Sequence, residues 1–547
     1  MAARLPVAVG AAALVAALLV SVAWWPAAQK NAGAPLEAAR AASPSPAASA
    51  TPTPTPTPSP APPALAWGPT ASEWDGALET ARALPVADAA GQVIVASIAS
   101  PSPVATEELV ASLSLGGVIV MADAVTDVDG VRALTDAAQA GAAAGTRDWG
   151  AIVGVDQEGG AVSRLRGLMP DLPSFMAAGA ASDKASVRGA YAQAAVDLHA
   201  MGFTVDFAPV ADATVGLADP IIRARSAGSD PERVSATVGA ALAGFVDGAV
   251  VPVVKHFPGH GSVTQDSHEE LPVQQVSLAD LEVRDMAPFA SAIEAGAPAV
   301  MMAHIAVPEW GDGPASLEPA AYEYLREVLG FEGVAMTDAL NMGAVQGTQA
   351  SGQAAVAALA AGADLLLMPP DPRVARDAIV AAVGSGEVPR ERLDEAAARM
   401  ILLSRWQASL EPEVDQGRDY ARELAAAGAT VAARDCSAPF VGDTVTLSGG
   451  WEDERAALAA ALEAHGVAVG DGGTSIVLMG GDDASANADV VVAMAGPWGL
   501  SASQATVYVG LYGRSAGALA GLADVLVGDA EPLGEWPVDV AVPFEVC

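Results

Sequence analysis

The 547-residue sequence is poor in positive charge and in cysteine. It has 27 lysines and arginines against 65 aspartates and glutamates, which gives a net charge of −38. Such a surface repels phosphate groups, so the composition argues against nucleic-acid binding and against docking on anionic lipid. Only Cys436 and Cys547 are present, and two cysteines imply no disulfide framework. We expect an acidic protein with no nucleic-acid partner.

Lysine and histidine are also scarce, and they gather in one stretch. The chain has three lysines, of which Lys255 is the last, and three of its six histidines follow closely: His256, His260 and His268. The apolar run 250–254 precedes them, so a buried strand is predicted to end where a loop with glycine and proline begins. Titratable residues at such a junction are typical of a catalytic site, although one histidine alone would indicate only a surface loop.

The N-terminus differs from the rest of the chain. Arg4 precedes an uncharged run over residues 5–28, and Trp24 and Trp25 lie near its end. The run indicates an export signal in residues 1–30, which is either cleaved or kept as a single-pass membrane anchor. No cysteine follows the run, which argues against a lipid-anchored protein. We therefore expect an exported protein, secreted or held at the cell surface.

Residues 31–66 are rich in proline, threonine and alanine, and residues 51–58 repeat Thr-Pro. This composition favours extended polyproline II and cannot build a packed core. We predict a disordered linker that holds a catalytic unit away from the membrane, within a cell wall.

From about residue 90 to 370, short apolar runs alternate with alanine-rich helical stretches such as 185–201, 231–247 and 278–295. Strands that alternate with helices predict a parallel sheet, and eight units over this length predict a TIM-type (β/α)8 barrel within residues 67–408. A doubly wound open sheet is the alternative. The eight apolar runs are 93–99, 117–122, 151–155, 204–210, 250–254, 299–305, 333–336 and 364–368.

Polar residues at the ends of these runs favour the barrel. In a barrel, the chemistry lies at the carboxyl ends of several strands, whereas an open sheet would not gather residues from five strands on one rim. Five runs end in, or carry, titratable residues, which are Asp156, Asp206 with Asp212, Lys255 with His256, His304, and Asp338.

A second alternation follows a boundary near residue 410. Apolar runs at 444–447, 475–479, 489–493 and 506–511 flank or separate helical stretches at 452–465 and 516–527. We interpret residues 409–547 as a small α/β sandwich domain.

Two positions suggest catalytic chemistry. Asp338 follows a buried strand, where a carboxylate is desolvated and rigidly aimed, as a nucleophile must be. The alternative is that Asp338 caps a helix N-terminus. Asp266 and His268 are separated by one residue, so on an extended segment they point the same way. A carboxylate beside an imidazole orients it as a general acid and base.

Two other kinds of site were weighed. His256, His260 and Asp266 have the types of metal ligands, but Phe257-Pro258-Gly259 breaks the helix that a paired-histidine zinc motif needs. Gly513-Arg-Ser515-Ala-Gly517 matches the nucleophile elbow of α/β-hydrolases. That fold would need a histidine after Ser515, and the last histidine is His465.

Several motifs together resemble family 3 glycoside hydrolases, in the β-N-acetylhexosaminidase branch that trims cell-wall muropeptides. The resemblance covers about residues 85–405, with the motifs in the family's order. They are Asp156-Gln-Glu-Gly-Gly160, Asp206-Phe-Ala-Pro-Val210, Lys255-His-Phe-Pro-Gly-His-Gly261, Asp266-Ser-His268 and Thr337-Asp338-Ala-Leu.

The resemblance implies roles for eight residues. Asp338 matches the nucleophile, and His268 with Asp266 matches the acid/base dyad, which lies on a mobile loop in that branch. The sugar-binding residues of the branch match Asp156, Arg164, Arg225, Lys255 and His256.

Two departures from the family pattern stand out. Ala161 and Ser163 replace longer polar residues, and the C-terminal domain is shortened. In the β-glucosidase branch, a residue of such a domain supplies the acid/base group. The dyad makes that unnecessary here, so we expect the domain to be structural or to position substrate.

The resemblance thus implies an exported, retaining enzyme that removes terminal β-N-acetylglucosamine from peptidoglycan fragments or related glycans. It implies no metal and no organic cofactor, and we expect a monomer. Another glycosidase or a phosphorylase on the same scaffold is an alternative, because a neutral imidazole tolerates an incoming phosphate better than a carboxylate does. A non-catalytic cell-wall-binding protein would have lost Asp338 or His268, and both are present.

Overall fold

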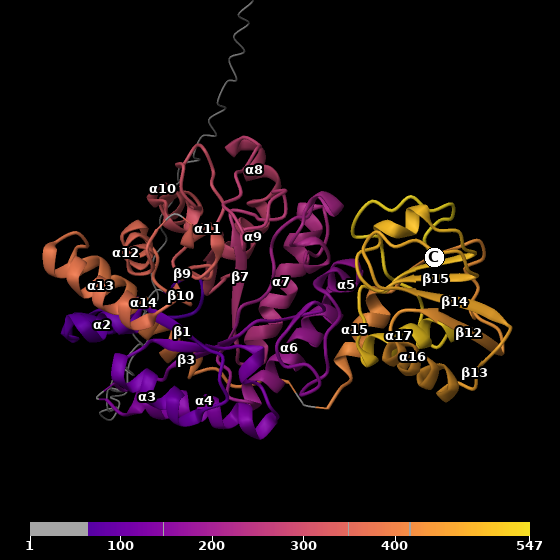
Figure 1. Ribbon diagram of the computed structural model, residues 1–547, viewed down its shortest axis with the longest axis horizontal. Helices are drawn as coiled ribbons and strands as arrows, with labels where there is room; N and C mark the ends of the chain where they lie inside the picture. Colours follow the sequence, from indigo (N-terminus) through magenta and orange to yellow (C-terminus); the bar gives the residue numbers. More distant parts are fainter. Residues whose placement is uncertain (1–63, 146, 348, 415–416) are drawn as a thin grey trace, which may run out of the picture. The chain divides into compact units, whose positions relative to one another are not determined.

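The computed structural model describes residues 64–145, 147–347, 349–414 and 417–547 (Figure 1). The predicted export segment, residues 1–30, and all but the last three residues of the predicted linker lie outside these ranges. Within the described ranges, no helix is both long and apolar enough to cross a membrane.

Eight parallel strands form one sheet in the order β10-β1-β2-β3-β6-β7-β8-β9. A parallel bridge between Met336 and Leu365 brings β9 beside β10, so the sheet closes on itself. The predicted (β/α)8 barrel is confirmed, and each predicted apolar run overlaps one strand. The strands are β1 (Ile94–Ile98), β2 (Gly117–Val120), β3 (Ile152–Val155), β6 (Val205–Asp206), β7 (Val251–Phe257), β8 (Ala299–Met302), β9 (Val334–Thr337) and β10 (Leu366–Leu367).

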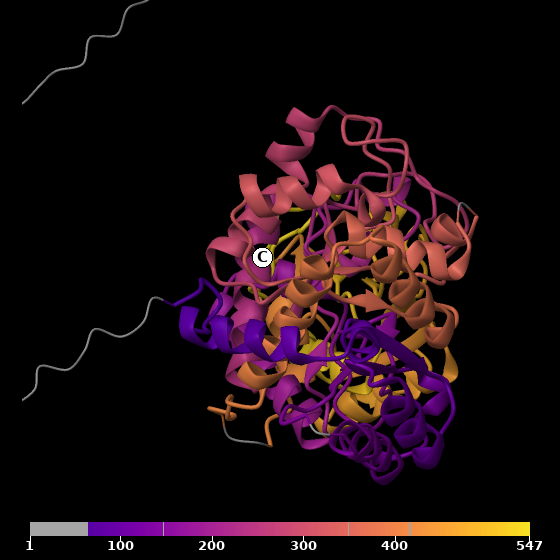
Figure 2. The same ribbon diagram turned by 90° about the vertical axis from the view of Figure 1, so that its left-hand side faces the viewer.

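Helices cover the outside of the barrel, as Figure 1 shows. In Figure 2, the indigo N-terminal helices lie beside the orange helices that precede residue 410, and α1 and α2 both pack against α14. The helices that surround the barrel are α1 (Ala71–Ala83), α2 (Val86–Gln92), α3 (Pro103–Leu113), α4 (Val128–Ala143), α5 (Phe175–Ala180), α6 (Lys184–Ala200), α7 (Pro231–Asp247), α8 (Leu278–Arg284), α9 (Ala287–Glu294), α10 (Pro319–Glu323), α12 (Ser351–Ala361), α13 (Pro372–Ser385) and α14 (Arg390–Gln407).

Local sequence explains where these helices begin and end. Asp230 caps α7 by accepting a hydrogen bond from the backbone N–H of Glu232, and Pro231 occupies the first helical position. The single helix predicted over 278–295 is wrong, because α8 ends at Arg284 and α9 begins at Ala287. Pro288 explains the break, since proline lacks an N–H and its ring clashes with the carbonyl four residues earlier, which here is that of Arg284.

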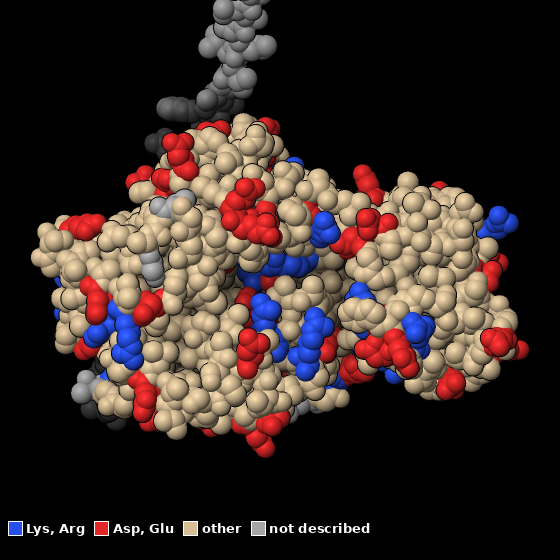
Figure 3. Space-filling model, viewed as in Figure 1, with Lys and Arg blue, Asp and Glu red and all other residues tan. Residues whose placement is uncertain are grey.

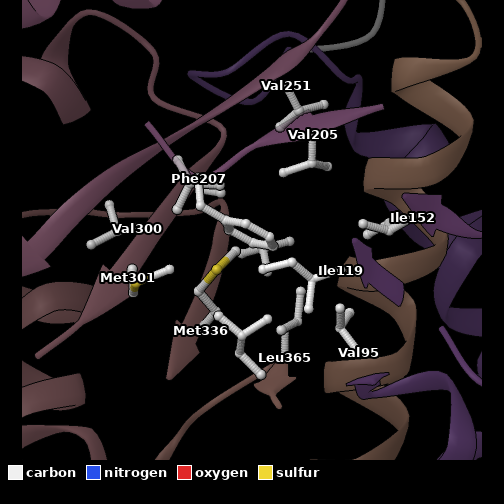
Figure 4. Close-up of a cluster of buried hydrophobic side chains, with 14 of the residues drawn as sticks. Val95, Ile119, Ile152, Val205, Phe207, Val251, Val300, Met301, Met336 and Leu365 are labelled. Atoms are coloured by element: carbon white, nitrogen blue, oxygen red, sulfur yellow. The ribbon is translucent and has the colours of Figure 1, made fainter. Parts of the chain in front are cut away.

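Apolar side chains fill the barrel interior. Figure 4 shows Val95, Ile119, Phe207, Met336 and Leu365 directed toward one another from different strands or from the residues next to them. All five are buried, and most strands are buried along their whole length rather than at alternate residues. This pattern follows from the helices, which cover the outer face while side chains fill the inner one. Polar residues such as Asp206 of β6 and Thr337 of β9 lie at the strand ends.

A second sheet forms the core of the C-terminal domain, in the order β11-β16-β15-β14-β12-β13, with only β11 antiparallel to its neighbour. The domain also contains α15 (Tyr420–Gly428), α16 (Glu452–Ala464) and α17 (Ala516–Val527), and α15 packs against α5 and α6 of the barrel. The predicted small α/β domain is confirmed. Its strands are β11 (Thr430–Ala433), β12 (Thr444–Gly449), β13 (Ala468–Val469), β14 (Thr474–Met479), β15 (Val490–Ala493) and β16 (Val507–Gly510).

The two cysteines, from which the sequence implied no disulfide framework, form one disulfide in the structure. Cys436 and Cys547 are joined, with their Cα atoms 5.3 Å apart. The C-terminal residues pair with β11, since Cys547 N–H donates to the carbonyl of Val431 and Val546 bridges Ala432. This pairing brings together two cysteines that are 111 residues apart in the sequence.

Candidate active site

A pocket opens at the carboxyl ends of the barrel strands. Its volume is about 380 Å³, near the lower end of the range for ligand sites, which suits one sugar unit. Figure 3 shows basic side chains around a hollow in this face of the molecule. The residues that line the pocket are Met121, Asp156, Glu158, Val162, Arg164, Ile221, Ile222, Arg225, Lys255, His256, His260, Ser267, His268, Met301, Asp338, Ala339, Asn341, Met342, Leu367 and Met368.

One wall of the pocket is a network of two acidic and three basic side chains. Lys255 Nζ lies 3.0 Å from Asp156 Oδ1 and 2.6 Å from Glu158 Oε1. Arg225 donates two hydrogen bonds to Glu158, from Nε at 2.9 Å and from Nη2 at 2.8 Å. Arg164 lies at the rim, 3.8 Å from Asp156. The paired geometry holds three cationic side chains at the pocket surface with their donors directed by fixed carboxylates.

Charge pairing keeps this network ionised despite its burial. Burial by itself raises the pKa of Glu158, but the positive charges of Arg225 and Lys255 outweigh it and lower that pKa below its usual range. Burial lowers the pKa of Lys255, and the nearby Asp156 and Glu158 reverse the effect and raise it. The site therefore presents charged donors to a ligand at neutral pH.

Asp206 lies beneath this wall and differs from the other acids. It is fully buried, and its Oδ1 accepts a hydrogen bond from the backbone N–H of Gln157, while Oδ2 has no partner among the described residues. Burial raises the pKa of Asp206 to about 8. The carboxyl is therefore protonated at neutral pH, and it supports the turn after β3 without adding a negative charge.

Asp212 fixes the position of His256. Its Nδ1 lies 2.7 Å from Asp212 Oδ2, and the backbone N–H groups of His256 and His260 both donate to Asp212 Oδ1. The pairing of β7 with β8 shifts register between Lys255 and Phe257, so His256 is an extra residue in the strand. Such bulges re-aim side chains near active sites. Lys255 and His256 both reach the pocket although they are sequence neighbours.

Asp338 lies on the floor of the pocket, directly after β9. Its backbone N–H donates to the carbonyl of Met302, and its Oδ1 accepts a hydrogen bond of 2.7 Å from the N–H of Ala339. It does not cap a helix, because the next helix, α11 (Gly343–Gln346), has Met342 at its N-cap. Desolvation raises the pKa of Asp338, but the positive potential of His256 and Lys255 and the hydrogen bond from Ala339 N–H outweigh it, so the net pKa is lowered. Asp338 is thus a half-buried, ionised carboxylate.

His304 fixes the chain that follows Asp338. Its Nε2 lies 3.0 Å from the carbonyl of Ala339, and its Nδ1 lies 2.6 Å from Ser316 Oγ. Burial lowers the pKa of His304, so the ring is neutral. A carbonyl only accepts, so Nε2 carries the proton and Nδ1 accepts from the serine hydroxyl. His304 therefore orients the peptide whose N–H contacts the Asp338 carboxylate.

His268 and Asp266 form a hydrogen-bonded dyad. His268 Nδ1 lies 2.8 Å from Asp266 Oδ1, which also accepts from the backbone N–H of His268. The His268 side chain is 59% exposed, and His268 lines the pocket. Burial raises the pKa of Asp266, but the two hydrogen bonds from His268 together outweigh this effect, so the net pKa is lowered. An ionised Asp266 leaves Nε2 of His268 free to exchange a proton with a ligand or with water.

The loop that carries the dyad is tied to both sides of the pocket. His260 Nε2 lies 2.8 Å from Ser267 Oγ, between the two dyad residues. The carbonyls of Ser267 and His268 accept hydrogen bonds from the N–H groups of Ala344 and Gly343 in α11. Burial lowers the pKa of His260 to about 4, so this tie is made by a neutral ring. These bonds place His268 close to the segment that follows Asp338.

The structure brings together all eight residues singled out from the sequence. Seven of them line the pocket, and Asp266 stands behind the seventh, His268. Sequence reasoning missed Glu158 as part of the site, and it named Asp212 and His304 at the ends of predicted strands without giving either a role. Glu158 stands two residues after Asp156, a spacing that puts both side chains on one side of an extended segment, and this signal would have found it.

The residues of the two alternative sites, a metal site and a nucleophile elbow, make other contacts in the structure. His256 and His260 turn to Asp212 and Ser267, and among the described residues no three histidines, cysteines or acids group as metal ligands. Ser515 is the N-cap of α17, accepts from Ala518 N–H and donates to the carbonyl of Asp171. A hydroxyl used in this way is not the exposed nucleophile of an elbow.

Comparison with known proteins assigns the barrel to a family. The model described as "Glycosyl hydrolase family 3 N terminal domain" matches residues 88–403, more than half of the chain. The chain belongs to glycosyl hydrolase family 3. The resemblance noted in the sequence is confirmed, and the protein is a glycoside hydrolase.

Family 3 relatives match both parts of the fold. The chain is 34% identical over 307 residues to "Beta-hexosaminidase LpqI" of Mycobacterium tuberculosis, an alignment over 54% of this chain and 77% of the relative. It is 35% identical over 323 residues to "Beta-hexosaminidase" of Chromobacterium violaceum, over 57% and 88%. A family 3 β-N-acetylglucosaminidase structure from Paenibacillus sp. matches with a TM-score of 0.73 at 26% identity, over 84% of this chain and 100% of that one. That coverage includes the C-terminal domain.

Proposed function

We propose that this family 3 enzyme is an exported β-N-acetylhexosaminidase that releases terminal β-N-acetylglucosamine from peptidoglycan fragments or related glycans. One observation carries the proposal: a half-buried, ionised Asp338 and the solvent-accessible His268–Asp266 dyad share one pocket with a cationic wall. The names of the relatives support the choice of sugar.

In the first step, a carboxylate oxygen of Asp338 attacks the anomeric carbon as the bond from that carbon to the leaving oxygen breaks. His268 starts as an imidazolium, with Nδ1–H directed to Asp266, and gives its Nε2 proton to the leaving oxygen. A covalent glycosyl-enzyme results. The usual template uses two carboxylates, and here the dyad replaces the second.

In the second step, the neutral His268 takes a proton from water through Nε2. The water oxygen attacks the anomeric carbon, and the bond to Asp338 breaks, which restores the carboxylate. Two displacements at one carbon retain its configuration. Asp338 is ionised before the substrate binds, and Ala339 N–H stabilises its carboxylate both before attack and after release of the sugar.

The basic wall would hold the sugar. Lys255, Arg225 and Arg164 present donors fixed by Asp156 and Glu158, which suits several hydroxyls at set positions. Asp156 and His256 line the same pocket and complete the set of polar groups. Directional contacts of this kind distinguish sugars that differ in one hydroxyl.

Phosphorolysis is the second candidate function. It is compatible with a histidine as the acid/base group. A neutral imidazole at His268 lets an anionic phosphate approach the glycosyl-enzyme, whereas a carboxylate at that place would repel it. The basic side chains of the pocket add a favourable potential.

Export rests on the sequence of the first 66 residues. The uncharged run over residues 5–28 suits a signal or a single-pass anchor, and the Thr-Pro repeat suits a spacer in a cell wall. An acidic enzyme placed there would meet peptidoglycan fragments directly.

A substrate comparison tests the activity. Turnover of nitrophenyl N-acetyl-β-glucosaminide and of nitrophenyl β-glucoside is measured with and without phosphate. We expect the first to be cleaved far faster, with free N-acetylglucosamine as product in both buffers. Sugar 1-phosphate as the main product would establish the phosphorylase instead, and preference for the glucoside would refute the hexosaminidase. Fractionation of cells that express the full chain tests export.

A further inference from the structure

The loop over residues 214–229 lies between the pocket and the C-terminal domain. On one side, Ile221, Ile222 and Arg225 line the pocket. Arg225 is the residue that pairs with Glu158. The position of this loop therefore decides where one of the cationic donors of the site lies.

The loop has a tight internal fold around Asp219. The carboxylate of Asp219 accepts hydrogen bonds from the backbone N–H groups of Ile221, Ile222 and Arg223. Arg223 adopts a φ of 44°, a left-handed conformation that is uncommon for residues with a β-carbon. A residue in this region persists only when surrounding contacts hold it there.

The barrel supplies some of the contacts that hold the loop, such as the hydrogen bond from Ser226 Oγ to the carbonyl of Asp212, and the C-terminal domain supplies others. Arg223 Nη1 lies 3.1 Å from Asp482 Oδ2, and the N–H of Ser229 donates to the carbonyl of Pro537 at 3.1 Å. Ala224 and Trp498 both pack against a buried cluster that includes Tyr512. The loop is thus held in part by residues of the C-terminal domain, more than 250 positions away in the sequence.

Two hydrogen bonds hold Asp482 in position for its ion pair with Arg223. It follows β14, its Oδ1 accepts from the N–H of Gly496, and its carbonyl accepts from the N–H of Gly499. Its side chain is 17% exposed, so the carboxylate is largely shielded from solvent. These bonds also fix the turn that carries Trp498, whose ring lies against Gly216 of the loop.

We infer that the C-terminal domain is a positioning element for substrate binding: through Asp482 and Arg223 it holds the loop over residues 214–229 so that Arg225 meets the sugar. The inference rests on the proposed function, in which Arg225 binds substrate. Arg223 and Asp482 do not line the pocket, so their effect passes through the loop.

Asp482→Asn tests the inference with little change of shape. The amide oxygen still accepts from Gly496, but its NH2 group faces the Arg223 guanidinium, so the ion pair is lost. We expect KM, and the inhibition constant of free N-acetylglucosamine, to rise about threefold to tenfold, with kcat within about twofold. Arg223→Met should act in the same way. The double variant should exceed neither single variant by much, because both changes remove one ion pair.

Tyr420→Phe is the matched control. Tyr420 of α15 donates to Asp197 of α6 at 2.8 Å, so this variant also removes one polar contact between the C-terminal domain and the barrel, away from the loop. We expect its KM to stay at the wild-type value. The melting temperature of each variant, measured by calorimetry, shows whether each is folded.

Two results would overturn the inference. One is a KM for Asp482→Asn and Arg223→Met equal to that of the wild type. The other is an equal rise in KM in Tyr420→Phe, which would indicate general loosening of the domain. Arg225→Lys separates this from the proposed function. If its KM were unchanged, the proposed role of Arg225 would fail; if its KM rose while that of Asp482→Asn did not, only the positioning role would fail.

Discussion

Replacement of Glu158 by glutamine tests the charge network that shapes the pocket. The Glu158 side chain is 3% exposed and accepts from Arg225 twice and from Lys255 once. Glutamine keeps the size of the side chain but removes the charge, and it turns one acceptor into a donor. Lys255 then keeps its ion pair with Asp156, whereas Arg225 loses the carboxylate to which it donates both of its hydrogen bonds.

The magnitude follows from the burial of the network. Removing one partner of a buried ion pair costs about 3–5 kcal/mol, because the other partner stays buried without its counter-charge. Asp156 still pairs with Lys255 at 3.0 Å, which favours the lower end of that range. For a domain of this size, we expect the melting temperature of the barrel to fall by about 5 °C. We also expect KM to rise about tenfold, because Arg225 and Lys255 lose their fixed orientation.

Calorimetry and steady-state kinetics on three variants provide the assay. They are Glu158→Gln, Arg225→Met and the double variant, with the barrel transition followed separately from that of the C-terminal domain. The double variant removes charge from both partners, so its melting temperature should lie closer to the wild type than that of Glu158→Gln. A Glu158→Gln protein as stable as the wild type, or a double variant with additive losses, would refute the reasoning.

Three further predictions concern single side chains. His268→Ala should slow turnover most for substrates with poor leaving groups, and Asp266→Ala should do so more mildly; a leaving-group series as flat as that of the wild type would refute the acid/base role. Asp206 binds its proton more tightly in the folded state, so it stabilises the fold at low pH and loses that effect as pH rises through a pKa of about 8. The melting temperature of Asp206→Asn relative to the wild type should therefore rise from pH 5 to pH 8, and a constant difference would contradict a neutral Asp206. Ser515→Ala should lower the free energy of unfolding by about 1 kcal/mol through loss of the helix cap and leave glycosidase activity unchanged. A folded but inactive variant would instead support the nucleophile elbow.

The barrel was accessible from the sequence because its strands are buried on both faces. Runs such as 117–122 and 250–254 are continuously apolar, and helical stretches lie between the runs, so the period of the pattern reveals the topology. The prediction that polar residues meet at the strand ends followed from that topology alone. It placed Asp156, Lys255 and Asp338 in one pocket before any contact was known.

Contacts between distant segments were not accessible in this way. Arg225 and Glu158 are 67 residues apart, and Arg223 and Asp482 are 259 apart. No local pattern encodes such pairs, because they depend on how loops fold back over the rim of the barrel. The disulfide was missed for the same reason, since only the pairing of the C-terminal residues with β11 brings its cysteines together.

Two helix ends in the structure are explained by single residues whose roles were not predicted from the sequence. Pro288 marks the break between α8 and α9, and a proline inside a helical pattern is a signal for such a break. Ser515 shows the opposite case, where a short motif matched a catalytic pattern but forms a helix cap. Whether Ser515 is a nucleophile or a helix cap depends on its position relative to α17, which the motif alone does not give.

Trapping of the glycosyl-enzyme tests the central claim most directly. A 5-fluoro derivative of N-acetylglucosamine with a good leaving group is incubated with the enzyme, and the labelled peptide is located by mass spectrometry. Our account predicts one label, on Asp338, that forms in the wild type and is lost in Asp338→Ala, which should also lose several orders of magnitude in turnover while it stays folded. A label on another residue, or substantial turnover by Asp338→Ala, would contradict it.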